Sequence, residues 1–251
     1  MPMRPTFSTS LRLGLALSAL GLVATACSST PAVTGQQLVT EAGTAARAAS
    51  SLSYKVVATQ SPTPSDPKPA VETLTAQISA PKAAESIRFS HGQGNIDVIL
   101  INGVIYIRAD ASTLFNALAL TTAVASQYAG QWISIQPSDS PYNQIAATLT
   151  PDANVSSFLP GGSNLVVGSE TTLRGTKVTP ITGRAPSNSA LATGVLRLYI
   201  NSKTKLPFAA GVEGITKTKR RNSEVVSFQS WNQPVQAVAP TGAVPFANII
   251  G

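Results

Sequence analysis

The chain has 251 residues, of which 43 % are apolar and only 12 % are charged, and its formal net charge is +7. A low charge content with many Thr, Ser, Val and Ile residues is typical of a strand-rich extracytoplasmic domain and argues against a nucleic-acid-binding protein. The single cysteine excludes a disulfide within the chain.

Residues 1–26 have the features of an export signal. Arg4 and Arg12 are positively charged, residues 13–23 form an apolar stretch, and small residues occupy positions 24–26. The apolar stretch is shorter than the roughly 20 residues that a transmembrane helix needs. We therefore predict a signal peptide that is removed, rather than a permanent membrane span.

Cys27 stands directly after these small residues and is followed by two serines and a threonine, as bacterial lipoprotein processing requires. We predict that the processed chain begins at Cys27, with a diacylglyceryl thioether on its sulfur and a further acyl chain on its amine. Two or more acyl chains anchor a protein stably in a membrane. Ala24 departs from the leucine that this processing signal usually has, and a signal-peptide cysteine without a role is the alternative.

The predicted cleavage defines the remaining organisation. Residues 27–36 are the acylated cysteine and a short tether, which would hold the protein on the outer face of the cytoplasmic membrane. Residues 37–251 are enough for one large domain with a core that needs no disulfides. Without Arg4 and Arg12 a mild basic excess remains, which suits an anionic membrane surface.

The first part of this domain combines one helix with several strands. Apolar residues recur at helical spacing over residues 37–52 and alternate over 53–60 as in a strand. Four prolines make 61–69 a loop. Residues 71–80 and 85–90 again have strand patterns.

The clearest local signal is a β-hairpin at residues 95–110. Two apolar runs are joined by Asn102-Gly103, the pair best suited to a type I′ turn. A two-residue turn places Asp97 opposite Arg108 and gives the hairpin two apolar faces. We therefore expect something apolar, either helices or a ligand, against each face. One face carries Ile96, Val98, Leu100, Ile105, Ile107 and Ala109, and the other carries Ile99, Ile101, Val104 and Tyr106.

The rest of the chain is predicted to be mainly β-structure. A helix at 112–128 precedes a strand at 132–136, and a helical pattern from 140 to 159 is broken at Pro151. Later strands are predicted at 165–173, 175–182, 194–201, 207–217 and 223–231, followed by an irregular tail. The predicted fold is a single α+β domain with one large curved antiparallel sheet of about nine to eleven strands, wrapped over helices that leave an apolar cavity.

The sequence offers little for catalysis. His91 is the only histidine and lies beside glycines in a predicted turn. No GxSxG motif is present, and the spacing of Ser79 and Lys82 matches a penicillin-interacting SxxK motif only formally, because a strand pattern precedes it. We expect no cofactor, no metal site and no enzymatic activity.

One dense basic cluster lies between two predicted strands. It is predicted to contact phospholipid head groups or a membrane, where each basic side chain contributes about 1 kcal/mol, and a solvated hairpin end is the simpler alternative. Trp132 and Trp231 are interpreted as core or sheet-face aromatics, and residues at a cavity mouth are the alternative. The cluster consists of Lys217, Lys219, Arg220 and Arg221.

Four features resemble the mycobacterial LppX/LprA/LprF/LprG lipoprotein family: the cysteine followed by two serines, a first helix ending in SLSYKVV, the hairpin VILINGVIYIRAD, and LRLYINSKTKLPFAAGVEG followed by VVSFQSWNQPV. The resemblance implies a half-barrel over helices, as in LolA/LolB-like carriers. It also implies a cavity for acylated lipids or glycolipids of the phosphatidylinositol mannoside, triacylglycerol or phthiocerol type, and non-covalent transport or presentation, with an envelope transporter as a candidate partner.

The family offers no fixed ligand-binding motif, so the cavity residues are predicted from the hairpin and the helix after it. Each buried methylene contributes about 0.8 kcal/mol, so a long acyl chain can be held without directional contacts. The alternatives are a dry core, a structural or signalling lipoprotein that binds a protein through a sheet edge or the 61–69 loop, and an enzyme. The predicted cavity residues are Ile96, Val98, Leu100, Ile105, Ile107, Leu114 and Leu118.

Overall fold

The computed structural model describes residues 33–62, 68–80, 82–89, 94–159, 162–185, 191–217 and 219–250. The predicted signal peptide, Cys27, His91 and the middle of the proline-rich loop lie outside the described residues. The predictions made for them stay predictions.

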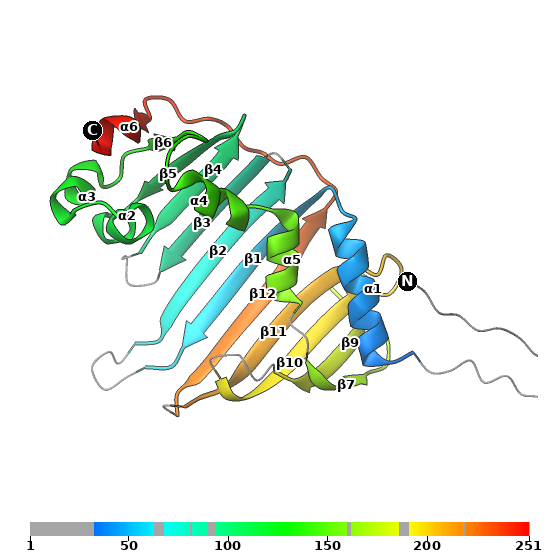
Figure 1. Cartoon of the computed structure of the whole chain (residues 1–251). Helices are drawn as coiled ribbons and strands as arrows, with labels where there is room; N and C mark the ends of the chain where they lie inside the picture. The colour runs from blue at the N-terminus through cyan, green and yellow to red at the C-terminus, as the bar shows by residue number, and fades with distance from the viewer. Residues whose placement is uncertain are drawn as a thin grey trace, which may run out of the picture. The chain divides into compact units, whose positions relative to one another are not determined.

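The described residues form one large, unclosed, curved sheet of 13 strands (Figure 1). Its strand order is β13-β6-β5-β4-β3-β2-β1-β12-β11-β10-β9-β7, with β8 paired to β9, and all pairs are antiparallel except β13 with β6. The strands are β1 (Ser51–Gln60), β2 (Ala70–Ser79), β3 (Lys82–Phe89), β4 (Ile96–Ile101), β5 (Val104–Ala109), β6 (Ile133–Ile135), β7 (Ser163–Val167), β8 (Thr171–Leu173), β9 (Thr176–Arg184), β10 (Leu191–Asn201), β11 (Pro207–Thr216), β12 (Arg221–Trp231) and β13 (Val244–Pro245).

Helices cover one face of this sheet, here called the helix-covered face, and the opposite face is called the open face (Figure 1). α1 packs against β7, β11 and α5, and α2 packs against β5 and α3. The described helices are α1 (Gly35–Arg47), α2 (Ala111–Leu118), α3 (Thr122–Tyr128), α4 (Tyr142–Thr148), α5 (Pro151–Phe158) and α6 (Ala247–Ile250).

The hairpin of β4 and β5 has the predicted register. Asp97 pairs with Arg108, and Ile101 pairs with Val104 across the turn. Asn102 and Gly103 both have positive φ, at 54° and 74°, as a type I′ turn requires. Among the described residues, helices lie on one side of the hairpin only, so the apolar cover expected on the other side stays a prediction. On the open side Ile99 and Tyr106 are half-buried.

The core lies between the sheet and its helices. Alternate residues of each strand point to the helix-covered face, as the period of two dictates. Leu52 and Tyr54 of β1 and Ile105 and Ile107 of β5 are at most 2 % exposed. They form one cluster with α1 and α2 through buried Ala42 and Leu114 and further residues of both helices.

Helix ends and breaks differ from the prediction for local reasons. α1 begins at Gly35 because Thr34 forms a capping box: its hydroxyl accepts from the Gln37 amide at 3.2 Å, and its own amide donates to the Gln37 side chain at 2.8 Å. The predicted helix at 112–128 is two helices, since Ala119 adopts a left-handed conformation and Thr121 caps α3. Pro151 starts α5, as predicted.

Two additional strands explain why the sheet exceeds the predicted nine to eleven. The segment predicted as one strand at 165–173 contains β7 and β8, separated at Gly168 to Glu170. The tail predicted to be irregular contributes β13, whose Val244 and Pro245 pair with β6.

Candidate functional site

A single apolar row runs across ten strands of the helix-covered face. Its members are direct cross-strand partners, so they lie side by side at about 4.8 Å spacing and the row extends for roughly 40 Å along the curved sheet. Leu74, Ile87 and Ile96, in the row's β2–β4 section, are only half-buried. The row consists of Ala109, Ile96, Ile87, Leu74, Val56, Val226, Ala210, Leu198, Ile181 and Val167.

One helix crosses this row and is held to the sheet by a buried polar contact. The Tyr54 hydroxyl of β1 donates a hydrogen bond to the Asn154 side-chain oxygen on α5. The Asn154 amide in turn donates to the carbonyls of Thr148 and Thr150, at 2.8 and 2.9 Å, between α4 and α5. Burial, followed by the negative charge of Glu85, raises the pKa of Tyr54 well above its usual range, so this hydroxyl stays protonated.

Aromatic packing completes the attachment of α5. Phe158 meets the rings of Tyr54 and Phe228 edge-on, with centroids 4.7 and 6.2 Å apart, and Phe228 stacks on Trp231 at 5.1 Å. A void of about 30 Å³ remains beneath α5, between Phe158 and the β10–β12 section of the sheet. That volume is about the volume that one molecule occupies in liquid water, so an acyl chain can enter there only if α5 moves.

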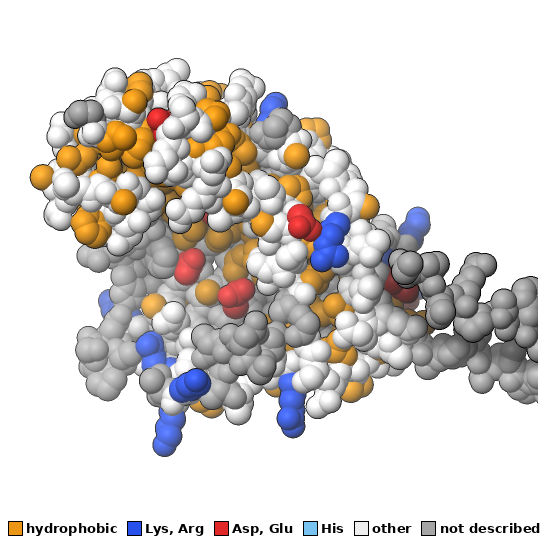
Figure 2. All heavy atoms as spheres, viewed as in Figure 1, with side chains coloured by type: hydrophobic (Ala, Val, Ile, Leu, Met, Phe, Trp, Pro, Cys, Tyr) orange, Lys and Arg blue, Asp and Glu red, His pale blue; other side chains and the backbone are white. Residues whose placement is uncertain are grey.

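Three carboxylates lie among the apolar residues of this face. Glu85 lies between Val98 and Ala76 in the strand register, and burial raises its pKa. Glu72 and Glu224 flank Ala58 from the two neighbouring strands. Burial and then the charge of Glu72 raise the pKa of Glu224. Figure 2 shows a hollow on this face, with apolar side chains and carboxylates on its walls.

The seven predicted cavity residues belong to the hydrophobic core or pack against it: five face the helices from β4 and β5, and Leu114 and Leu118 lie on α2. Val98, Ile105, Ile107, Leu114 and Leu118 are at most 6 % exposed. Ile96 and Leu100 are half-buried, and Ile96 is part of the apolar row. Their role in lipid binding stays a prediction.

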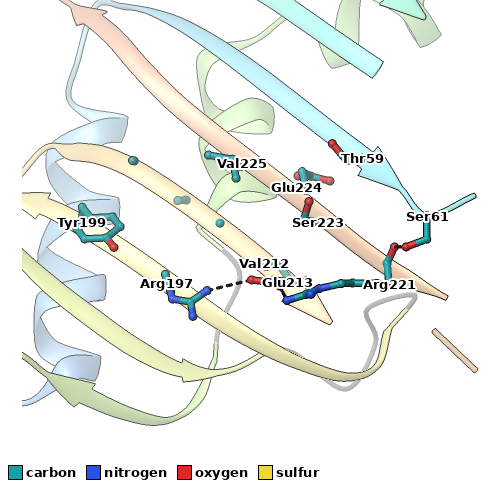
Figure 3. A pocket seen from close by; sticks show the side chains of 13 residues that line it. Thr59, Ser61, Arg197, Tyr199, Val212, Glu213, Arg221, Ser223, Glu224 and Val225 are labelled. Atoms are coloured by element: carbon teal, nitrogen blue, oxygen red, sulfur yellow. Dashed lines mark hydrogen bonds and ion pairs between the residues drawn. The ribbon is translucent and has the colours of Figure 1, made fainter. Parts of the chain in front are cut away.

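The open face carries a trough of about 450 Å³ over β10–β12 and the end of β1 (Figure 3). Ala209 and Gly211 form its floor, because the small residues at these positions stand between larger cross-strand neighbours. Tyr199 and Arg197 flank the floor from β10, and Val225 flanks it from β12.

One glutamate at the end of this trough holds two arginines. Glu213 accepts hydrogen bonds from Arg221, including one of 2.8 Å from Nε, and pairs with Arg197 Nη1 at 3.4 Å (Figure 3). These two guanidinium groups, Arg221 first, lower the pKa of Glu213. The carboxylate therefore stays ionised, and the group keeps one net positive charge. A second trough of about 320 Å³ on the open face includes Asp97, which is paired in the same way with Arg88 and Arg108 at 2.6 and 2.8 Å.

Two residues of the predicted head-group cluster are exposed in a turn, and the other two form contacts within the fold. Lys217 and Lys219 are exposed in the β11–β12 turn. Arg220 instead donates to the Ser61 carbonyl at 2.6 Å and ties this turn to the end of β1, and Arg221 pairs with Glu213. Trp231 is part of the aromatic cluster beneath α5, whereas Trp132 lies on the open face under the guanidinium of Arg108, 4.7 Å away.

The described residues give no support to the catalytic motifs weighed from the sequence. Ser79 and Lys82 pair across the β2–β3 turn, so they are not one helical turn apart. No group of three or more potential metal ligands occurs among the described residues. In the same part of the chain, no helix is long and apolar enough to cross a membrane.

Two of the solved structures to which this chain is similar come from mycobacteria. LprF from Mycobacterium bovis matches with a TM-score of 0.50 and 12 % identity, over 83 % of this chain and 97 % of that one. The chain shares the fold of LprF. The lipoprotein LppX from Mycobacterium tuberculosis matches at a TM-score of 0.49 and 15 % identity, over 81 % of this chain and 99 % of that one. No family model and no curated protein match the chain. The fold implied by the sequence resemblance is confirmed, and at these identities the likeness concerns fold alone.

Sequence reasoning missed both the complete apolar row and the open-face trough. The row depends on nine strand pairs and on the register of each, and only the β4–β5 hairpin reveals its register in the local sequence. The sequence signal for the trough is the pair Ala209 and Gly211 in PFAAGVEG. Their small side chains leave space between the charged and aromatic residues of the neighbouring strands.

Proposed function

We propose that this protein is an exported lipoprotein, anchored through acylated Cys27, which binds acylated lipids or glycolipids and carries or presents them in the cell envelope without catalysis. The apolar row across ten strands is the observation that carries the proposal. Burial of acyl methylenes against it, at about 0.8 kcal/mol each, can hold a lipid tail without a directional contact.

The half-buried residues of the row are the proposed entry point. Leu74, Ile87 and Ile96 still have apolar surface to bury, whereas the β10–β12 section is closed by α5. A tail that begins in the β2–β4 section can extend further only by displacing Phe158 and α5. The proposal therefore combines a partly open groove with a movable helix.

The carboxylates on this face argue for entry of the tail first. Glu72, Glu85 and Glu224 are the charged side chains of the strand residues that face the helices in β1–β5 and β10–β12. A phosphate brought among them meets like charges in a partly desolvated place. The phosphate head group of a phosphatidylinositol mannoside is proposed to remain outside the hollow, near the β11–β12 turn with Lys217 and Lys219 or held by an envelope transporter. A triacylglycerol or phthiocerol-type cargo has no phosphate and is proposed to be held through its acyl chains alone.

Native mass spectrometry of the full chain, expressed in its own host, tests this proposal. We expect a lipid-sized mass to remain on the protein. Leu74→Glu should remove that mass, and Thr73→Glu is the matched control because its side chain points to the open face from the next position of β2. Circular dichroism establishes that both variants are folded.

Two outcomes would contradict the carrier function. Wild-type protein without a bound lipid would favour a packed core or a protein-binding lipoprotein. Equal loss of lipid in Leu74→Glu and Thr73→Glu would show that the row is not the binding surface. In the same host, Cys27→Ser should move the protein out of the membrane fraction, and unchanged membrane association would remove the acyl anchor from the proposal.

A further inference from the structure

Charged side chains are segregated between the two faces of the sheet. In strands β1–β5 and β10–β12 the register sends every lysine and arginine to the open face. These side chains are all exposed. The set consists of Lys55, Lys82, Arg88, Arg108, Arg197 and Arg221.

The acidic residues of the same strands do not neutralise this face. Three of them point to the helix-covered face, and the two on the open face, Asp97 and Glu213, each lie between two arginines. The open face of these eight strands therefore carries an excess of four positive charges, and the other face carries only negative ones. Each clamped carboxylate also fixes the guanidinium groups beside it on the sheet surface.

Apolar side chains stand among these charges. Val195, Ile215 and Val225 are 45 %, 46 % and 48 % exposed, and all three point to the open face. Val195 is the cross-strand neighbour of Glu213, and Ile215 is that of Arg221. The trough floored by Gly211 lies in the same region. This combination of exposed aliphatic groups and basic groups is the one that partitions into the head-group region of a bilayer.

We propose that the open face is a docking surface for an anionic lipid bilayer. Charge complementarity selects this partner: the basic residues are distributed over five strands between β5 and β10, rather than gathered at one point, which fits an extended anionic surface. Docking in this orientation turns the negatively charged, helix-covered face away from the membrane. It does not depend on the proposed cargo, because the two activities use opposite faces.

Vesicle co-sedimentation tests the docking, with the full chain carrying Cys27→Ser so that no acyl anchor contributes. The vesicles are phosphatidylcholine alone, or phosphatidylcholine mixed with phosphatidylglycerol. We expect binding to the mixed vesicles that weakens as salt is added. Lys55→Gln with Lys82→Gln should lower the partition coefficient by about 30-fold, since each basic side chain near an anionic surface contributes about 1 kcal/mol.

The matched control is Lys203→Gln with Lys205→Gln, which removes the same charge from the β10–β11 turn and should change binding less than about twofold. The leader is common to all variants, so it cancels in the comparison. Equal losses in the two pairs, or binding that ignores phosphatidylglycerol, would overturn the proposal. Release of the protein from the vesicles by glycerol 3-phosphate at matched ionic strength would also overturn the proposal, because it indicates a site for free phosphate. A change of oligomeric state without vesicle binding would overturn it as well. Retention of lipid cargo by Lys55→Gln with Lys82→Gln separates this result from a failure of the carrier function.

Discussion

The contact between Tyr54 and Asn154 should control how readily α5 leaves the sheet. The two side chains are 1 % and 9 % exposed, and they join β1 to α5 across the core. Tyr54→Phe removes the donor and leaves the Asn154 oxygen buried without it, at a cost of about 1–3 kcal/mol. For a domain of this size, about 2 kcal/mol lowers the midpoint of thermal unfolding by about 4–8 °C.

Hydrogen exchange distinguishes a local effect from a global one. If the contact mainly restrains α5, a loss of about 2 kcal/mol lowers the exchange protection of the amides in Pro151–Phe158 by about 30-fold. The exchange protection of the amides in β4 and β5 should fall only as far as the global free energy of unfolding falls. An acyl-chain probe should then bind faster, because α5 opens more often. The matched control is Tyr199→Phe, the same chemical change in the open-face trough.

The reasoning is refuted if α5 exchanges no faster in Tyr54→Phe than in Tyr199→Phe. A double-mutant cycle gives a second check on the same contact. Asn154→Leu should lower the free energy of unfolding more than Tyr54→Phe, because it also removes the hydrogen bonds to the carbonyls of Thr148 and Thr150. The double variant should cost less than the sum of the two single ones.

Two further predictions concern stability. Burial raises the pKa of Glu85, so the folded state binds a proton more tightly than the unfolded chain, and the free energy of unfolding falls as pH rises from the usual glutamate pKa through the raised one. Glu85→Gln should therefore unfold at a higher temperature than wild type at neutral pH, and calorimetry should show this difference vanishing near pH 4. A difference that grows on acidification would contradict the prediction. In α1, Gly35→Ala places a Cβ 2.7 Å from the Leu165 Cβ and should lower the free energy of unfolding by about 1–3 kcal/mol. Gly43→Ala meets only the Arg47 guanidinium, at 3.4 Å, and should raise the free energy of unfolding by about 0.5–1 kcal/mol. Thermal melts that rank the two variants the other way would show that α1 does not pack on β7 as described.

Much of the fold could be predicted because its signals are local. Asn102-Gly103 fixes a type I′ turn, and with it every pair of the β4–β5 hairpin. Pro151 marks the start of α5. In contrast, the predicted helix at 112–128 follows an apolar stripe that continues through the break at Ala119, since the α2 and α3 parts both bury residues in the core. A stripe of this kind indicates burial and does not show whether the helix is continuous.

The candidate site could be predicted only in part, for a related reason. Val98, Ile105 and Ile107 were assigned to an apolar face from the hairpin alone, and the structure places them on the helix-covered face. The rest of that face depends on the pairing of β1 with β12, whose residues are more than 160 positions apart in the chain. No local pattern specifies such a register.

Charge segregation follows from the same long-range pairing. Only the pairing of the strands brings the lysines and arginines of β1–β5 and β10–β12 to one face. On β3, for example, Glu85 and Arg88 lie three residues apart and face opposite sides. In sequence, such charges look like a solvated mixture with a small net excess. Once the strands pair, the same residues give β1–β5 and β10–β12 one positive face and one negative face, and this asymmetry distinguishes the membrane-docking proposal from a general attraction of a basic protein to anionic lipid.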